Sequence, residues 1–239
     1  MASAARLRLW HSVDTRSLRV LWTFEELNLK RGRDYALKTL PFPPRQHRPE
    51  FLVEQNILGT VPWFVHREPH DANGPRASMS ESCAVPLYLT EHFKYPDLSV
   101  RIGEADHGAF LNWLFHADAT LTFPQSIVMR YGIHEPGRAD VAAEDYAKWY
   151  IARLRLLSNA LNDGRQFLCA GRMTIADICV GYALHCGSKD GLAGSGLAAA
   201  GKQPLCAFYK DSVRDYLDRM RQRPAWKAAQ AAQILPDDF

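Results

Sequence analysis

The chain has 239 residues, 47% of them hydrophobic and 23% charged, which is the composition of an ordinary globular protein with room for two modest domains. Its formal net charge is only +3 and it contains no run of like charges, so neither nucleic acid nor an anionic membrane is the expected partner. The N-terminus lacks an apolar signal core, and no apolar stretch approaches the length of a membrane span. We therefore expect a cytoplasmic protein.

Cysteine and histidine spacing argues against disulfides and metal sites. The five cysteines include no C-x-x-C pair, and their odd number gives no disulfide framework. The nine histidines show no H-E-x-x-H or similar ligand spacing. We expect reduced, mostly buried thiols and no metal.

The first part of the chain alternates between strand and helix patterns. Residues 6–10 alternate as a half-buried strand does, residues 17–29 carry apolar side chains at helical spacing, and residues 34–40 offer a second strand. A short helix near residues 49–55 precedes residues 59–89, which indicate a strand, a hairpin and the start of a helix. A β-α-β unit followed by two hairpin-joined strands and a helix is the order of the thioredoxin-like fold, in which the first two strands pair in parallel.

Strand-like patterns stop near residues 95–98, and nearly everything afterwards repeats at helical spacing. We place the domain boundary there, with a thioredoxin-like domain at residues 1–94 and an all-helical domain at residues 102–239. The Gly/Ala/Ser-rich stretch 187–201 has no periodicity and is predicted to be an irregular surface loop. The predicted helices of the second domain are a short C-terminal one and, before it, residues 104–131, 139–163, 174–187 and 206–222.

A capping box is predicted at the start of the third of these helices. Thr174 can accept a hydrogen bond from the backbone N–H of Asp177, and the Asp177 side chain can reach back to Thr174. The expected role of both residues is structural.

Two segments between residues 59 and 89 could hold the ends of a small peptide. A cis X-Pro bond is accessible, so Val61-Pro62 can turn sharply at a strand start and leave edge groups for an extended ligand. Glu81 and Ser82 would offer backbone N–H groups, a hydroxyl and the positive end of a helix dipole to a carboxylate. A strand-start proline and a solvated helix cap are the alternative interpretation. Pro86 predicts either a late helix start or a kink.

These segments resemble the glutathione site of cytosolic glutathione transferases. The resemblance is carried by Asn56-x-Leu-Gly-x-Val-Pro and by Glu-Ser-x-Ala-Val-x-x-Tyr-Leu from residue 81. It implies that glutathione is the co-substrate, that Pro62 is cis, and that the Val61 backbone, flanked by Thr60, pairs with the cysteinyl backbone of glutathione. It further implies that Glu81 and Ser82 hold the γ-glutamyl end. The same family habit implies a homodimer.

The resemblance places the thiol-activating group in the loop of residues 11–17. There Thr-Arg-Ser-Leu-Arg-Val-Leu-Trp resembles the Ser-Arg-Ser-x-Arg-Ile-Leu-Trp segment of some fungal and bacterial members, which assigns Thr15 to the position of their serine. A hydroxyl donor beside a helix N-terminus can lower a thiol pKa that is ordinarily near 8.5. Ser12, Ser17 and a backbone N–H are reserve donors, a one-residue shift would substitute Asp14, and helix capping is the alternative role. This loop contains no cysteine, so mixed-disulfide chemistry is not expected.

Two weaker sets complete the expected site. Gln46 and His47 match the stretch that binds the glycine carboxylate of glutathione in plant-type members, with a solvated polar loop as the alternative. His116, Thr120 and Phe123 share one helical face by spacing and form the expected electrophile pocket, with core packing as the alternative for the phenylalanine.

Taken together, the sequence predicts a thioredoxin-like α/β domain followed by a helical bundle, in a glutathione transferase that conjugates the glutathione thiolate to a small hydrophobic electrophile. One alternative is a glutathione-dependent lyase, dehalogenase or isomerase, which would use the same thiolate. The other is a non-catalytic glutathione-transferase-like binding protein.

Overall fold

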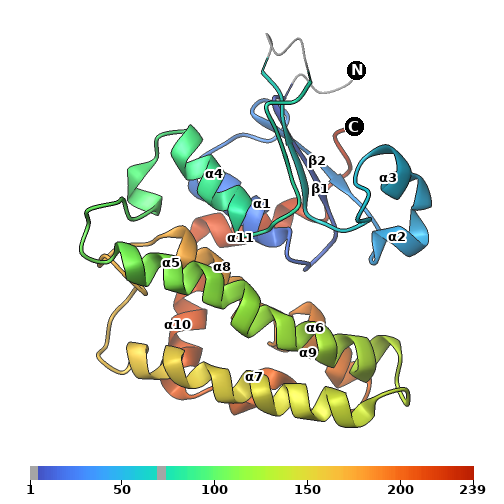
Figure 1. The fold of residues 1–239 in the computed structure, drawn as a ribbon, viewed down its shortest axis with the longest axis vertical. Coiled ribbons are helices and arrows are strands. Elements are labelled where there is room, and N and C mark those ends of the chain that lie inside the picture. Colours follow the sequence, from blue (N-terminus) through green and yellow to red (C-terminus); the bar gives the residue numbers. More distant parts are fainter. Residues whose placement is uncertain (1–4, 69–73) are drawn as a thin grey trace. The chain divides into compact units, whose positions relative to one another are not determined.

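The computed structural model describes residues 5–68 and 74–239. The chain divides into two compact units, the first formed by Met1–Lys94 together with Arg223–Phe239 and the second by Tyr95–Gln222 (Figure 1). The last segment thus belongs to the unit that contains the sheet, whereas the sequence placed it with the helical domain.

A four-stranded mixed sheet forms the centre of the first unit, and it confirms the predicted thioredoxin-like fold. The strand order is β2-β1-β3-β4. β1 pairs in parallel with β2 and antiparallel with β3, and β4 pairs antiparallel with β3. The connection from β1 to β2 passes through α1 (Leu18–Glu26). The predicted hairpin turn includes residues 69–73, which lie outside the described residues. The strands are β1 (Leu7–His11), β2 (Tyr35–Thr39), β3 (Trp63–His66) and β4 (Ala77–Met79).

Helices cover both faces of this sheet (Figure 1). On one face α1 packs against α4 (Ala84–His92), and Phe24 of α1 stacks on Tyr35 of β2 with ring centroids 4.5 Å apart. On the other face α3 (Pro49–Glu54), preceded by α2 (Pro44–His47), brings Phe51 against Trp10. Because successive strand residues point to opposite faces, the apolar strand residues are shared between two separate cores.

The C-terminal segment completes the first unit. Its helix α11 (Pro224–Ala232) packs on α1, where Trp226 meets Trp22 edge to face at 4.8 Å. Beyond the helix, the Asp238 carboxylate accepts hydrogen bonds from the backbone of Leu37 at 2.8 Å and from the Arg31 side chain at 2.7 Å. The tail therefore covers the outer edge of β2, which would otherwise expose unpaired backbone groups.

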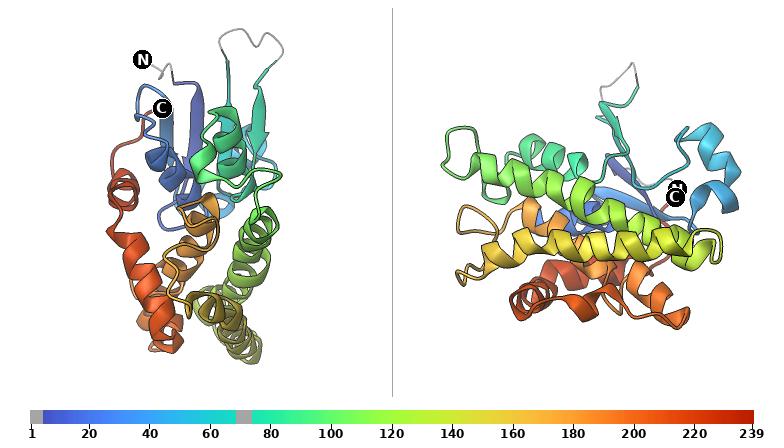
Figure 2. Two further views of the ribbon diagram at one scale, coloured as in Figure 1. Left: turned by 90° about the vertical axis from the view of Figure 1, so that its left-hand side faces the viewer. Right: turned by 60° about the horizontal axis from the view of Figure 1, so that its bottom comes forward.

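The second unit contains helices only, as predicted. One continuous helical stretch comprises α5 (His107–Phe115), a π-helical segment (His116–Thr122), α6 (Phe123–Met129) and a second π-helical segment (Arg130–His134). It packs along α7 (Asp140–Leu161), as Figure 2 shows in green and yellow. The remaining elements are η1 (Pro96–Leu98), α8 (Ile175–Cys186), α9 (Leu192–Ala199), η4 (Leu205–Phe208) and α10 (Asp211–Gln222).

Helix α8 is the centre of the second unit, since all its residues are buried. It begins with the predicted capping box, in which the Asp177 carboxylate accepts from the backbone N–H of Thr174 at 2.9 Å. Asp177 also accepts from the backbone of Leu168 and from the Tyr216 hydroxyl, each at 2.9 Å. One carboxylate thus joins α8, the preceding loop and α10.

The prediction of an irregular loop at residues 187–201 is wrong, because α9 occupies the middle of that stretch. Its small residues allow close contact with the rest of the unit. A Cβ at Gly194 would overlap the carbonyl oxygen of Ser188, and one at Gly196 would lie 2.5 Å from the Ile133 side chain. The glycines that made this stretch resemble a loop are therefore needed for close packing of α9 against its neighbours. Across the described part of the chain, no helix combines the length and apolar character needed to cross a membrane.

Candidate functional site

Strand pairing gathers the predicted glutathione-binding segments at one end of the sheet. Trp10, near the end of β1, is paired with Trp63, the first residue of β3. The loop after β1 therefore lies beside the segment that precedes β3. Met79 of β4 is paired with Phe64, so the chain leaving β4 toward Ser82 runs toward the same end.

The turn before β3 carries the predicted cis bond, since the Val61-Pro62 peptide is cis. Asn56 organises this turn, because its amide donates to the carbonyl of Thr60 at 2.8 Å and its carbonyl oxygen accepts from the backbone of Leu58 at 3.1 Å. Gly59 has a φ of +58°, and a Cβ there would lie 2.9 Å from the Arg45 side chain. β3 begins two residues after Val61, which leaves the Val61 backbone outside the sheet ladder in the part of the chain described.

Glu81 and Ser82 form a turn that precedes α4. The Glu81 carbonyl accepts from the backbone N–H groups of Ala84 and Val85, both at 3.1 Å. Pro86 is the third residue of the helix, where a backbone N–H would have no intrahelical partner. Of the two predicted outcomes, the late helix start is correct.

A buried arginine determines how the Ser82 hydroxyl is used. Arg19 of α1 is fully buried, and its guanidinium donates to Ser82 Oγ at 2.7 Å and to Cys83 Sγ at 3.4 Å. Since the oxygen of Ser82 accepts from Arg19, its own proton is directed away from that bond. Ser82 is 4% exposed. The hydroxyl is therefore oriented as a donor at the turn before α4.

The loop after β1 contains a buried hydrogen-bond network. Asp14 donates its backbone N–H to Gln233 Oε1 at 2.8 Å, which identifies that oxygen as an acceptor. His11 Nε2 lies 3.0 Å from the same oxygen and therefore donates to it, so His11 Nδ1 accepts from Ser17 Oγ at 2.7 Å. Burial lowers the pKa of His11 to about 4, against the weaker opposing effect of Gln233, and the ring is neutral at pH 7.

Thr15 belongs to this network, and its hydroxyl proton is used inside the protein. Thr15 Oγ1 lies 2.8 Å from the Ser12 carbonyl and 2.7 Å from Ser17 Oγ. Because Ser17 gives its one proton to His11, the Thr15 proton serves both of these contacts. Thr15 is 4% exposed, whereas Ser12 is fully buried and its Oγ has no hydrogen-bond partner within residues 5–68 and 74–239.

Gln46 and His47, the predicted ligands of the glycine carboxylate, are both exposed at the end of α2. Thr60 is also exposed, and its carbonyl is held by Asn56. These side chains are accessible to a ligand but are not fixed toward one another by any hydrogen bond that links them in the described structure.

The predicted electrophile pocket falls on an irregular part of its helix. His116 and Thr120 lie in the π-helical segment His116–Thr122, and Phe123 begins α6. The predicted common face required 3.6 residues per turn. A π-helix has more residues per turn, so this spacing no longer places the three side chains on one face. Phe123 is 48% exposed and meets Tyr146 edge to face. Burial, followed by the charge of Arg153, lowers the pKa of His116.

Arg19 is the residue that the sequence interpretation missed. It lies within the resembling segment that begins at Thr15, but no role was assigned to it. A usable signal is present: the residues that follow it, Val20, Leu21 and Trp22, are all apolar, so a charged side chain there must find a polar partner or be exposed.

The three-dimensional comparisons identify the fold. No protein-family model and no curated protein matches the sequence. Among solved structures, glutathione transferase URE2P6 from Phanerochaete chrysosporium in complex with oxidized glutathione is 22% identical, with a TM-score of 0.74 and coverage of 96% of this chain and 97% of that one. A glutathione transferase from Methylococcus capsulatus is 19% identical, with a TM-score of 0.71 and coverage of 95% and 98%. One from Pseudomonas putida with bound glutathione disulfide is 22% identical, with a TM-score of 0.71 and coverage of 94% and 90%. The protein has the glutathione transferase fold.

Proposed function

We propose that the protein binds glutathione at the end of its sheet and transfers the glutathione thiolate to a small hydrophobic electrophile. The observation that carries this proposal is the Ser82 hydroxyl, which the buried Arg19 orients as a donor at the turn before α4. A hydroxyl held in this way, just before the N-terminus of a helix, suits a carboxylate. The solved structures of this fold from P. chrysosporium and P. putida contain oxidized forms of glutathione, which supports the choice of ligand.

The peptide part of glutathione is assigned to the turn before β3. The Val61 backbone precedes the sheet ladder, so it can pair with the extended cysteinyl unit as an additional strand would. Glu81 and Ser82 then receive the γ-glutamyl end. Thr60 flanks the pairing segment, and the exposed Gln46 and His47 are assigned to the glycine carboxylate.

We assign thiolate stabilisation to the Thr15 hydroxyl. It should lower the thiol pKa less than a hydroxyl whose proton made no other hydrogen bond. To donate to sulfur, Thr15 must withdraw its proton from Ser12 and Ser17. Both keep a partner, because the Ser12 carbonyl still accepts the Thr15 backbone N–H at 3.2 Å and Ser17 Oγ still accepts the Ser12 N–H at 3.4 Å. Exchanging a neutral bond of about 1 kcal/mol for a charged one of about 1.5–3 kcal/mol gains about 0.5–2 kcal/mol, which lowers the thiol pKa by roughly half to one and a half units.

His11 does not serve as the base that removes the thiol proton. Its pKa of about 4 lies more than four units below that of a free thiol, near 8.5. Moving the proton from sulfur to this imidazole would therefore be uphill by about 6 kcal/mol. The role of His11 and Ser17 is to hold the loop, and the thiol proton leaves to solvent.

The proposal is tested by ultraviolet titration of the bound glutathione thiol, together with turnover of a generic aromatic halide. Thr15→Val keeps the side-chain shape and removes the donor, so it should raise the bound-thiol pKa by about one unit, while Thr15→Ser should restore it. Ser12→Ala is the matched control, because its hydroxyl has no partner in the described structure.

Each other result of this test points to a different assignment. A pKa that rises in Ser12→Ala and not in Thr15→Val would transfer the role to Ser12. Glutathione binding without turnover of any electrophile on a broad panel would favour the non-catalytic binding protein. Turnover of carbonyl or halogenated substrates without a conjugated product would favour the lyase, dehalogenase or isomerase.

A further inference from the structure

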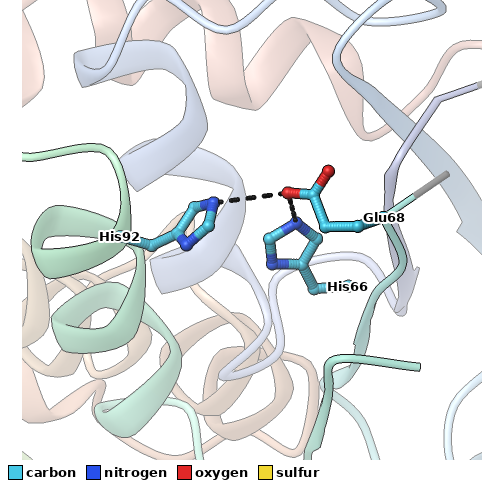
Figure 3. Close-up of side chains that lie close together, drawn as sticks. All are labelled: His66, Glu68 and His92. Atoms are coloured by element: carbon cyan, nitrogen blue, oxygen red, sulfur yellow. Dashed lines mark hydrogen bonds and ion pairs between the residues drawn. The ribbon is translucent and has the colours of Figure 1, made fainter. Parts of the chain in front are cut away.

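Two histidines and a glutamate converge in the first unit (Figure 3). His66 is the last residue of β3, Glu68 follows two residues later, and His92 is the last residue of α4. Glu68 Oε1 lies 3.1 Å from His66 Nε2 and 3.7 Å from His92 Nε2. The three ligand-type atoms are all within 4.8 Å of one another.

We propose that His66, Glu68 and His92 bind a divalent transition-metal ion of the Zn²⁺ type, with one coordination position left to an exchangeable ligand. Zinc is held by nitrogen and oxygen ligands at about 2.0–2.2 Å, so neighbouring ligand atoms around a tetrahedral ion lie about 3.3 Å apart. The two distances from Glu68 Oε1 bracket that value. Two histidines and one glutamate also form a known set of three protein ligands for zinc with an open fourth position.

The surroundings orient the histidine rings for this role. His66 Nδ1 lies 2.7 Å from the Tyr88 hydroxyl, and the Tyr88 and His92 rings stack with an interplanar angle of 12°. A metal-bound His66 would carry its proton on Nδ1 and donate it to Tyr88, which leaves the Nε2 lone pair for the ion. Such an outer partner is a regular feature of histidines that bind metals.

The local charges set the affinity. Burial lowers the pKa of both His66 and His92, and neutral imidazoles are the form that binds a metal. Arg6 pairs with Glu68 Oε2 at 3.0 Å, which leaves Oε1 for the ion, while Arg76 lies 4.0 Å from Oε1 and opposes a cation. The side chains of Arg6 and Arg76 are 60% and 52% exposed, so solvent screens both. We expect the two arginines to weaken zinc binding without preventing it.

The cluster is separate from the glutathione site because it lies at the opposite end of β3. His66 is paired with Leu7 at the start of β1, whereas Trp63 is paired with Trp10 near its end. Its sequence signature is weak, since the two histidines are 26 residues apart and on different elements. This proposal does not rest on the proposed transferase activity.

The test is calorimetric titration of chelator-treated, full-length protein with Zn²⁺, followed by absorption spectroscopy with Co²⁺. We expect one ion per chain, a cobalt spectrum of nitrogen and oxygen ligands without thiolate charge-transfer bands, and an increase in melting temperature on zinc addition. Glu68→Gln and His92→Phe should each weaken zinc binding more than about 10-fold. Loss of a residue that only hydrogen-bonds to a metal ligand already costs about 10-fold or more, and these two residues are proposed as ligands themselves. His92→Phe keeps an aromatic ring against Tyr88, so the helix end stays packed.

His134→Ala is the matched control, because His134 is an exposed histidine in the other unit. It should bind zinc as the parent does. The proposal would be overturned by any of three results. These are a zinc affinity that is unchanged in folded Glu68→Gln and His92→Phe, a zinc affinity that falls only in the control, and a thiolate charge-transfer band with Co²⁺.

Discussion

Replacement of His11 by asparagine should make the stability of the protein less sensitive to acid. His11 is fully buried, and burial lowers its pKa from about 6.5 to about 4. Between these two values the unfolded chain binds a proton that the folded protein does not, so the free energy of unfolding falls as the pH falls. Above about pH 7.5 the ring is neutral in both states and contributes no pH dependence.

The magnitude follows from the shift. Two and a half pKa units correspond to about 3 kcal/mol once the pH is below both values, and about 2 kcal/mol of this is lost between about pH 7.5 and about pH 5. Asparagine can still accept the Ser17 hydrogen bond but cannot be protonated. The variant should therefore be less stable than the parent near neutral pH, through lost packing, and lose about 2 kcal/mol less than the parent on acidification.

The assay is urea unfolding of both proteins over this pH range. Histidines elsewhere titrate in both proteins, so the difference between the two curves isolates His11. Parallel curves would show that His11 is not buried and neutral as described, and would remove the basis for the proton assignment in the Thr15 network.

Substitutions at three further positions test the packing. Asp177→Ala should destabilise the protein by about 3–5 kcal/mol, because it leaves several buried donors unpaired, and Asp177→Asn should recover part of this in a denaturant titration. Gly194→Ala should cost about 1–3 kcal/mol through its clash with the Ser188 carbonyl, and an unchanged melting temperature would contradict the placement of α9. Trp226→Ala should cost about 3–5 kcal/mol by uncovering Trp22, and a near-neutral effect would argue against α11 as part of the first unit.

The sequence predicted those features that depend on local pattern. The alternation at residues 6–10, the helical spacing after Ser17 and the capping box at Thr174 each reflect chemistry within a few residues, and the structure contains all three. The cis Val61-Pro62 bond was predicted from the family resemblance. The sequence pattern did not decide where the helix that contains Pro86 begins. The structure begins it at Ala84, which places Pro86 in the first turn.

The features that the sequence did not predict depend on contacts between distant segments. The C-terminal tail reaches β2 through Asp238, about 200 residues from Leu37, and nothing local in the tail specifies that partner. Helix α9 was missed because its glycines are required by neighbouring backbone and not by a turn. Gln233 determines the His11 tautomer, and this in turn makes Thr15 the donor to Ser17. No residue spacing within the loop reveals this dependence on a distant residue.

The measurement that tests the central claim most directly is calorimetric titration of glutathione into the parent protein and into Ser82→Ala. We predict one glutathione bound per chain, and binding weakened by about 1–3 kcal/mol in the variant, because a donor to a charged carboxylate is lost. Ser82→Ala should also lower the melting temperature, because the buried Arg19 guanidinium loses its acceptor at 2.7 Å, so the affinities are compared at a temperature where both proteins are folded. Arg19→Met is the companion variant that removes the group orienting Ser82. Absence of glutathione binding to the parent protein, or equal affinity in Ser82→Ala, would contradict the proposed site.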